Sequence, residues 1–182
     1  MTGVQTCALP ILSSTTRGIR PGEENGVNYH FLNVEEFDEK IVQGDFLENA
    51  KVFDNYYGTA KSAVEAQLKA RKEVILEIDW QGAQQVRKLM PEAISIFILP
   101  PSKEELHKRL TNRGTDSEEI IERRMQDAVS EMSHYDEFDY IVVNNNFDIA
   151  LNKLQSIFTA NRLLKDKQAA VHKNMIEALT ES

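Results

Sequence analysis

The chain has 182 residues, of which 41% are hydrophobic and 27% are charged, and its formal net charge is −8. This length fits one domain, or one domain with a small insertion, and the apolar share is sufficient for a hydrophobic core. The acidic balance argues against a protein that binds nucleic acid through a broad basic face, whereas a small phosphorylated ligand needs only a few well-placed arginines.

The single cysteine, Cys7, excludes a disulfide within the chain and makes a cysteine-based zinc site implausible. The longest apolar runs, such as Ile96–Leu99 and Tyr140–Val143, have four residues, and a membrane-spanning helix needs about 20. The N-terminus also lacks the features of a signal peptide. We therefore expect no membrane partner and a reducing, cytoplasmic environment.

Residues 1–12 differ from the rest of the chain, because they carry no periodicity and hold the only cysteine. One interpretation is a frayed terminus, which is common. The other, which we favour, is a foreign leader such as translated cloning sequence. The domain proper is then expected to cover residues 13–182.

The first chemical cluster is Ser13–Glu23, which combines hydroxyl groups, Arg17, Arg20 and a Pro-Gly turn. Such a loop offers hydroxyl, backbone and guanidinium donors to a phosphate group. Short loops of this composition are also commonly just solvated, so this cluster alone decides little.

A helix is predicted over Val34–Gln43, because Asn33 and Glu36 have the spacing of a capping box. After it, Phe46–Ala50 carries the carboxylate Glu48, and Asn55–Thr59 carries tyrosine and threonine hydroxyls beside a glycine. This second cluster reads either as a ligand site or as a hairpin with surface tyrosines.

Three short apolar segments are predicted to be buried strands: Val74–Ile78, Ile94–Leu99 and Tyr140–Val143. Helical stretches of a dozen or more residues separate them, and this alternation is typical of an α/β fold with a parallel sheet and flanking helices. Buried parallel strands are almost entirely apolar. The first of the three breaks this rule.

In that first strand, Glu77 and Asp79 are two residues apart and are therefore expected on one face, near the carboxyl end. Ligands bind at the carboxyl ends of open parallel sheets. The two carboxylates form either an internal ion pair or a contact with a metal or ligand. We favour the contact, because burying unpaired charge is costly.

A second helix is predicted over Lys103–Asn112, capped by Ser102, with Gly114 at its left-handed end. Arg109 and Arg113 are four residues apart on one face of this cationic run. A charged, solvated helix is the commoner reading of such spacing. The alternative is a mobile lid that lays arginines on a transferring phosphate.

Two more helices complete the prediction. One begins at Asp116 or Ser117 and runs to about His134, with apolar residues at helical spacing. The last begins near Asp148 and carries an apolar stripe. After Lys165 the tail is more polar and is expected to project.

Together, these clusters resemble the guanylate kinase family, and more closely its bacterial members. The motifs fall in the family's order over Ser13–Leu164, and the ordered set is far more specific than any single motif. They are Ser-Ser-Thr-Thr-Arg-x-x-Arg-Pro-Gly-Glu, Glu-Asn-Ala, Asn-Tyr-Tyr-Gly-Thr, Ile-Leu-Glu-Ile-Asp-Trp-Gln-Gly-Ala, Leu-Pro-Pro-Ser, Arg-Leu-x-x-Arg-Gly and Ile-Val-Val-Asn. The resemblance implies an ATP-dependent nucleoside monophosphate kinase with a P-loop NTPase-like fold.

The resemblance assigns a GMP-binding region to residues 13–70. The residues that would hold the GMP phosphate are Arg17, Arg20, Tyr29 and Tyr57. Those that would read the guanine are Ser13, Glu48, Thr59 and Glu77. Carboxylates suit this task, since the Watson–Crick edge of guanine carries two donors and adenine presents an acceptor at the same ring nitrogen. Many family members have Asp where this chain has Glu77.

For phosphoryl transfer, the resemblance implies ATP and Mg²⁺, with Asp79 in the magnesium or phosphate shell and Asn144 on the ATP side. A lid over residues 102–135 would clamp the transferring group through its arginines: Arg109, Arg113 and Arg124.

The family also has a strand, a phosphate loop of the type Gly-x-x-Gly-x-Gly-Lys-Ser and a helix ahead of the GMP segment. None of the eight glycines, at positions 3, 18, 22, 26, 44, 58, 82 and 114, lies in such a pattern. We therefore expect a guanylate kinase shortened at its N-terminus, without this strand, loop and helix, and inactive as written. The alternative is a non-catalytic guanylate kinase-like module that binds partner proteins.

Overall fold

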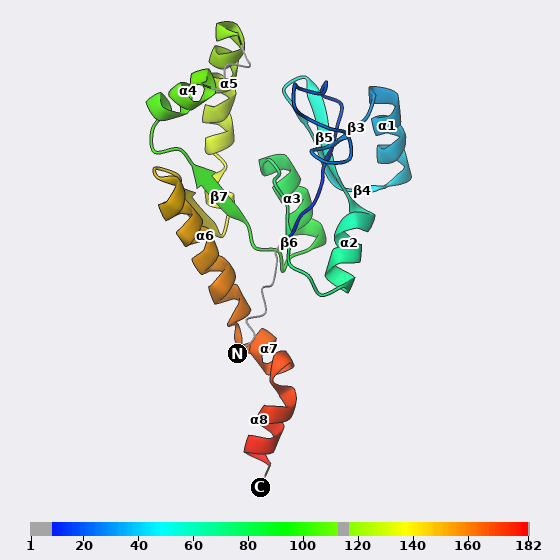
Figure 1. Cartoon of the computed structure of the whole chain (residues 1–182), viewed down its shortest axis with the longest axis vertical. Helices are drawn as coiled ribbons and strands as arrows, with labels where there is room; N and C mark the ends of the chain where they lie inside the picture. The colour runs from blue at the N-terminus through cyan, green and yellow to red at the C-terminus, as the bar shows by residue number, and fades with distance from the viewer. Residues whose placement is uncertain (1–8, 113–116, 182) are drawn as a thin grey trace. The chain divides into compact units, whose positions relative to one another are not determined.

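The computed structural model describes residues 9–112 and 117–181, which form two compact units (Figure 1). The N-terminal unit extends to Ile94 and the C-terminal unit begins at Ser95. Residues 1–8 of the expected leader, Arg113, and the expected helix boundaries at Gly114 and Asp116 lie outside the described residues.

The N-terminal unit contains a four-stranded sheet in the order β3-β2-β5-β4. Strands β4 and β5 form an antiparallel hairpin, β2 pairs antiparallel with β5, and β3 pairs parallel with β2. The β4–β5 pairing is interrupted by a bulge between Phe46 and Glu48. The strands are β2 (Ser14–Thr15), β3 (His30–Phe31), β4 (Phe46–Val52) and β5 (Asn55–Ala60).

Helix α1 (Val34–Gln43) covers part of this sheet and has the predicted boundaries. Its start is fixed by the capping box, in which the Asn33 side chain accepts from the Glu36 N–H and the Glu36 carboxylate accepts from the Asn33 N–H. Phe37 is fully buried and stacks on Phe46, with ring centroids 4.6 Å apart. This aromatic contact attaches α1 to the hairpin.

The rest of the N-terminal unit is a parallel pair of short strands with two helices. A hydrophobic core of Leu47, Val64 and Val86 joins this part to the hairpin, with Ile11, Val74, Leu76, Ile78, Met90 and Ala93 packed around it. The elements are β1 (Leu9–Pro10), β6 (Val74–Ile75), α2 (Lys61–Lys69) and α3 (Trp80–Leu89).

The predicted strand Val74–Ile78 is wrong in its length, because strand pairing ends at Ile75. Glu77 is exposed, and the Asp79 carboxylate caps α3 by accepting from the Gly82 N–H at 2.9 Å. A side chain that caps a helix competes with continued strand structure. The expected pair of buried carboxylates on one strand face is therefore not formed.

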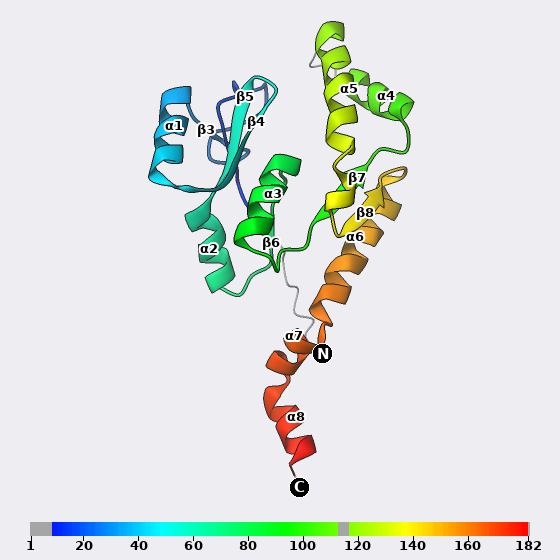
Figure 2. The same ribbon diagram turned by 180° about the vertical axis from the view of Figure 1, so that it is seen from behind.

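The C-terminal unit pairs β7 (Ile96–Leu99) with β8 (Tyr140–Val143) in parallel. Helix α4 packs against α5, and α6 packs against β8. Figure 2 shows the same helices from behind. The helices are α4 (Lys103–Asn112), α5 (Glu118–Met132), the 3₁₀ turn η1 (Tyr135–Glu137), α6 (Phe147–Arg162), α7 (Lys165–Val171) and α8 (Lys173–Thr180).

One expectation for this unit needs correction. The strands are not fully buried: Ile98 and Ile141 are exposed, and of β8 only Val142 is buried. The tail after Lys165 forms the helices α7 and α8, neither of which contains a buried residue. Among the described helices, none has both the length and the apolar character needed to cross a membrane.

Candidate functional site

An ion pair organises the loop that follows β2. The two terminal nitrogens of Arg17 donate to the two carboxylate oxygens of Glu23 at 3.0 and 2.8 Å, and the same carboxylate accepts from the Arg20 N–H at 2.8 Å. The hydrogen bond with Glu23 is the main cause of the raised pKa of Arg17, and in turn the pKa of Glu23 is lowered. Glu23 therefore orients the guanidinium of Arg17, which the sequence predicts to contact a phosphate.

Aromatic side chains surround this guanidinium. Its central carbon lies 5.4 Å from the ring centroid of Tyr29 and 5.6 Å from that of Phe31. Tyr29 and Tyr57 meet edge to face at 6.3 Å, and the Tyr57 hydroxyl adds to the raised pKa of Arg17. The structure thus brings three of the four expected phosphate contacts together, and Arg20 belongs to the same loop.

Glu48 lies on β4 directly opposite Thr59 on β5, and the two residues are 3% and 1% exposed. Burial is the main cause of a raised pKa for Glu48, the charge of Asp79 adds to it, and the Thr59 hydroxyl and N–H partly oppose it. Among the described residues, the buried Thr59 hydroxyl has no well-aligned hydrogen-bond partner. This hydroxyl and the neighbouring Glu48 carboxyl group are therefore available to form hydrogen bonds with a ligand.

The remaining guanine residues lie in different surroundings. Ser13 precedes β2 and is half-buried, and its carbonyl accepts from the His30 N–H at 2.9 Å. Glu77 is exposed in the segment between β6 and α3. The structure thus brings Glu48 and Thr59 together, while Ser13 and Glu77 lie on other segments of the N-terminal unit.

Asp79 is committed to the start of α3. One carboxylate oxygen accepts from the Gly82 N–H and the other from Gln81 Nε2, both at 2.9 Å. Among residues 9–112 and 117–181, no three His, Cys, Asp or Glu side chains group into a metal site. Magnesium commonly retains several waters and takes one or two carboxylates plus substrate phosphates. A single carboxylate such as that of Asp79 is compatible with a magnesium ion of this kind.

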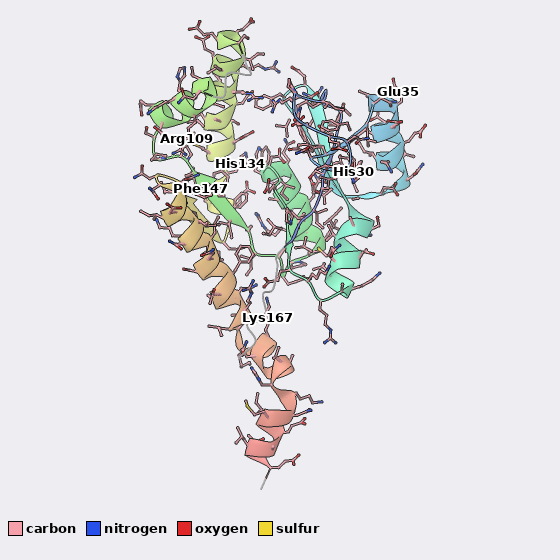
Figure 3. All side chains as sticks on the ribbon, viewed as in Figure 1. His30, Glu35, Arg109, His134, Phe147 and Lys167 are labelled. Atoms are coloured by element: carbon pink, nitrogen blue, oxygen red, sulfur yellow. The ribbon has the colours of Figure 1, made fainter. Side chains whose placement is uncertain are left out.

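In the C-terminal unit, Arg109, which is labelled in Figure 3, lies on α4. It pairs with Glu105 one turn earlier, with Arg109 Nε 2.8 Å from Glu105 Oε1. Spacing alone could have revealed this partner, since i,i+4 pairs are neighbours on a helix. Arg124 is half-buried on α5. Asn144 follows β8, and its N–H extends the strand pairing to the Leu99 carbonyl at 2.8 Å.

Two residues around Glu48 were not identified from the sequence. Gly82, in the first turn of α3, lies against the Glu48 carboxyl group, and the amide of Gln85 bonds the backbone of Asn49 on β4. No local spacing signals these contacts, because 36 residues separate Gln85 from Asn49.

Comparisons with known proteins agree with one another. The model of the family described as guanylate kinase matches residues 5–161. The chain is 65% identical over 170 residues to a guanylate kinase of Hydrogenovibrio crunogenus, covering 93% of this chain and 83% of that protein. A guanylate kinase of Photobacterium profundum is 58% identical over 168 residues, with 92% and 81% coverage. The crystal structure of guanylate kinase from Anaplasma phagocytophilum superposes with a TM-score of 0.79 at 32% identity, covering 94% of this chain and 84% of that one.

Proposed function

The chain belongs to the guanylate kinase family, and on that premise we propose that its N-terminal unit binds GMP as the acceptor of a phosphoryl group from ATP. The products of this transfer are GDP and ADP. In this proposal residues 13–70 form the GMP-binding region and residues 102–135 form the lid.

The observation that carries the proposal is the buried Glu48 carboxyl group opposite Thr59. A carboxylate in such a place costs free energy unless a partner with hydrogen-bond donors pairs with it. Guanine offers a ring N–H and an exocyclic amine on one edge, while adenine places an acceptor at that ring nitrogen. Glu48 thus selects GMP over AMP, and Thr59, Ser13 and Glu77 complete the guanine contacts.

For the phosphate, the proposal uses the ordered guanidinium of Arg17 together with Arg20, Tyr29 and Tyr57. Arg17 already holds the fixed orientation that a two-point contact with an anion requires. The Tyr29 and Tyr57 hydroxyls supply further donors.

On the donor side, the 182 residues contain no Gly-Lys-Ser or Gly-Lys-Thr. A phosphate loop normally supplies backbone N–H groups, a lysine and a magnesium-binding hydroxyl to the nucleoside triphosphate. We therefore expect this chain to bind GMP but to transfer phosphate slowly. Asp79 would help to hold Mg²⁺, and the bound ion would supply positive charge to the phosphates.

The proposed role of the lid rests on the positive charge of its arginines and on their positions in residues 102–135. Arg109, Arg113 and Arg124 stabilise negative charge on the group in transfer, and Asn144 contacts the ATP side. Such stabilisation acts mainly in the transition state.

The second candidate is a non-catalytic interaction module, which the absence of the Gly-Lys-Ser loop favours. Such a module has no use for a buried carboxylate that selects guanine, nor for an arginine and two tyrosines gathered for a phosphate. The geometry of the N-terminal unit therefore supports the nucleotide site.

A Glu48→Gln variant tests the proposed function. An amide turns a donor toward the donors of guanine and loses the charge, so we expect a cost of about 1.5–3 kcal/mol in GMP binding. Calorimetric titration with GMP and AMP, without ATP, measures the effect. An unchanged preference for GMP over AMP would refute the assignment of Glu48.

A further inference from the structure

The proposal concerns how α3 controls the Glu48 carboxyl group, and it rests on the proposed function of Glu48 in GMP binding. Strand β4 is at the edge of its sheet, so one side of its backbone has no neighbouring strand. An unpaired edge leaves N–H and C=O groups to be satisfied by other partners. Helix α3 provides these partners.

Gln85 takes the place of a neighbouring strand at Asn49. Its side-chain nitrogen donates to the Asn49 carbonyl at 2.7 Å, and its side-chain oxygen accepts from the Asn49 N–H at 3.2 Å. One side-chain amide thus satisfies both backbone groups of the residue next to Glu48. Because Asn49 is covalently adjacent to Glu48, this pair of bonds restricts the position from which the carboxyl group extends.

A second glutamine acts one turn earlier on the same helix. Gln81 Nε2 donates to Asp79 at 2.9 Å and reaches the Lys51 carbonyl at 3.5 Å. Residues 49 and 51 direct their backbone groups to the same side of an extended strand. The two glutamines therefore follow the free edge of β4 with the spacing of the strand itself.

Gly82 provides the space for the carboxyl group. A Cβ at this position would lie 2.5 Å from Glu48 Oε2 and 3.2 Å from its carboxyl carbon. Real Cβ atoms essentially never approach another atom as closely as the first of these distances. The absence of a side chain at Gly82 therefore leaves the space next to the carboxylate that a Cβ would fill.

The bulge in β4 explains why this arrangement is possible. Leu47 and Glu48 are neighbours and both are buried, whereas a regular strand directs successive side chains to opposite faces. The register shift between Phe46 and Glu48 changes this alternation. Leu47 then joins the core with Val86, while Glu48 reaches Gly82 one helical turn away on the same side of α3.

We propose that Gly82 and Gln85 are positioning residues for nucleotide specificity: Gly82 leaves the space for the Glu48 carboxyl group, and Gln85 fixes the strand that carries it. Neither residue needs to touch GMP. Their effect is on the preference for guanine, defined here as the Kd for AMP divided by the Kd for GMP.

Gly82→Ala is the sharpest test, because alanine favours a helix more than glycine does. An alanine Cβ would displace the carboxyl end of the Glu48 side chain, and it would also lie 3.3 Å from Ile78 Cβ. We expect the variant to fold with an unchanged or higher melting temperature. Its guanine preference should fall about tenfold or more, as expected when a charged hydrogen bond is displaced.

A double-mutant cycle separates positioning from a general structural effect. In a Glu48→Gln background, Gly82→Ala should change the guanine preference little further, because the group that it displaces has already lost its function. Gln85→Met removes both bonds to Asn49 at similar side-chain length and should also lower the preference. Lys88→Ala, at an exposed site on α3, is the matched control and should leave it unchanged.

The outcomes separate this inference from the proposed function. If Glu48→Gln lowers the guanine preference while Gly82→Ala and Gln85→Met keep it, α3 does not position the carboxylate, and the proposed function stands. If Glu48→Gln leaves the preference intact, Glu48 does not read guanine and the proposed function fails. The inference is supported if Gly82→Ala and Gln85→Met each lower the guanine preference but lower it no further in the Glu48→Gln background.

Discussion

Arg17 and Glu23 form a two-point ion pair in which both terminal guanidinium nitrogens meet a carboxylate oxygen, at 3.0 and 2.8 Å. The two side chains are only 13% and 18% exposed. The pair therefore fixes the guanidinium before any ligand arrives, and the rings of Tyr29 and Phe31 flank it. Preorganisation of this kind reduces the entropy lost when an anion binds.

The first prediction follows from this pair. Arg17→Ala removes the ordered donor group, so the affinity for GMP should fall by about 1.5–3 kcal/mol, the usual value of a hydrogen bond to a charged group. Guanosine, which lacks the phosphate, should bind with unchanged affinity. Calorimetry with both ligands gives the comparison, and Lys69→Ala on the exposed side of α2 serves as control. Equal losses for GMP and guanosine would show that Arg17 has only a structural role.

The second prediction concerns pH and Glu48. Because burial raises the pKa of this carboxyl group in the folded state, the folded protein holds its proton to higher pH than the unfolded chain does. The stability associated with the protonated form is fully present below the unfolded pKa and is lost as pH rises through the folded pKa. Chemical denaturation at a series of pH values should show this decline in the free energy of unfolding, and Glu48→Gln should reduce it.

GMP binding should show the opposite sign. Guanine donors need the ionised carboxylate as acceptor, so the affinity for GMP should rise as pH increases through the raised pKa of Glu48. The phosphate of a nucleotide also titrates, near pH 6 by analogy with phosphorylated side chains. The informative quantity is therefore the difference between the protein and Glu48→Gln at each pH. Parallel pH profiles for the two proteins would contradict the assignment.

The third prediction concerns phosphoryl transfer. The 182-residue chain should release ADP from ATP and GMP far below the roughly 1–100 per second typical of kinases, because it carries no Gly-Lys-Ser loop. A coupled ADP assay with magnesium measures this directly. Turnover within the usual kinase range would show that the loop is dispensable.

The lid arginines are tested by fusing a strand, a Gly-x-x-Gly-x-Gly-Lys-Ser loop and a helix ahead of Leu9, so that β1 is kept. In that fusion, Arg109→Ala should lower turnover about a hundredfold, or ~2.7 kcal/mol in the barrier, as for the loss of one preorganised donor. GMP affinity without ATP should change little. Lys108→Ala, at the exposed neighbouring position, should alter neither quantity. Near-normal turnover of Arg109→Ala would leave Arg109 as an ordinary surface residue paired with Glu105.

Local signals in the sequence predicted some elements accurately. The helix Val34–Gln43 has the expected boundaries, because its capping box joins residues that are three apart in the sequence. The helix Lys103–Asn112 begins where expected for the same reason, since the Ser102 hydroxyl accepts from the Glu105 N–H. The predicted strand Val74–Ile78 is too long, because the hydrogen bond from the Gly82 N–H to Asp79 starts a helix close behind it. The apolar pattern of the sequence predicts the strand but carries no information about this capping bond.

The candidate site divides in a similar way. The family resemblance pointed to Arg17, Tyr29 and Tyr57, and the structure places these side chains together. The Glu23 partner, the Gly82 contact and the Gln85 bonds to Asn49 were not foreseen. The last two join α3 to β4 across more than 30 residues of chain, and one sequence carries no signal of such a contact.

The most direct test of a guanine-selective acceptor site is a calorimetric titration of the unmodified 182-residue chain with GMP and, separately, AMP, in the absence of ATP. The account predicts that GMP binds at one site and that AMP binds about tenfold or more weakly, since adenine presents an acceptor to the Glu48 carboxylate. Equal affinity for the two nucleotides, or no GMP binding by folded protein, would contradict it.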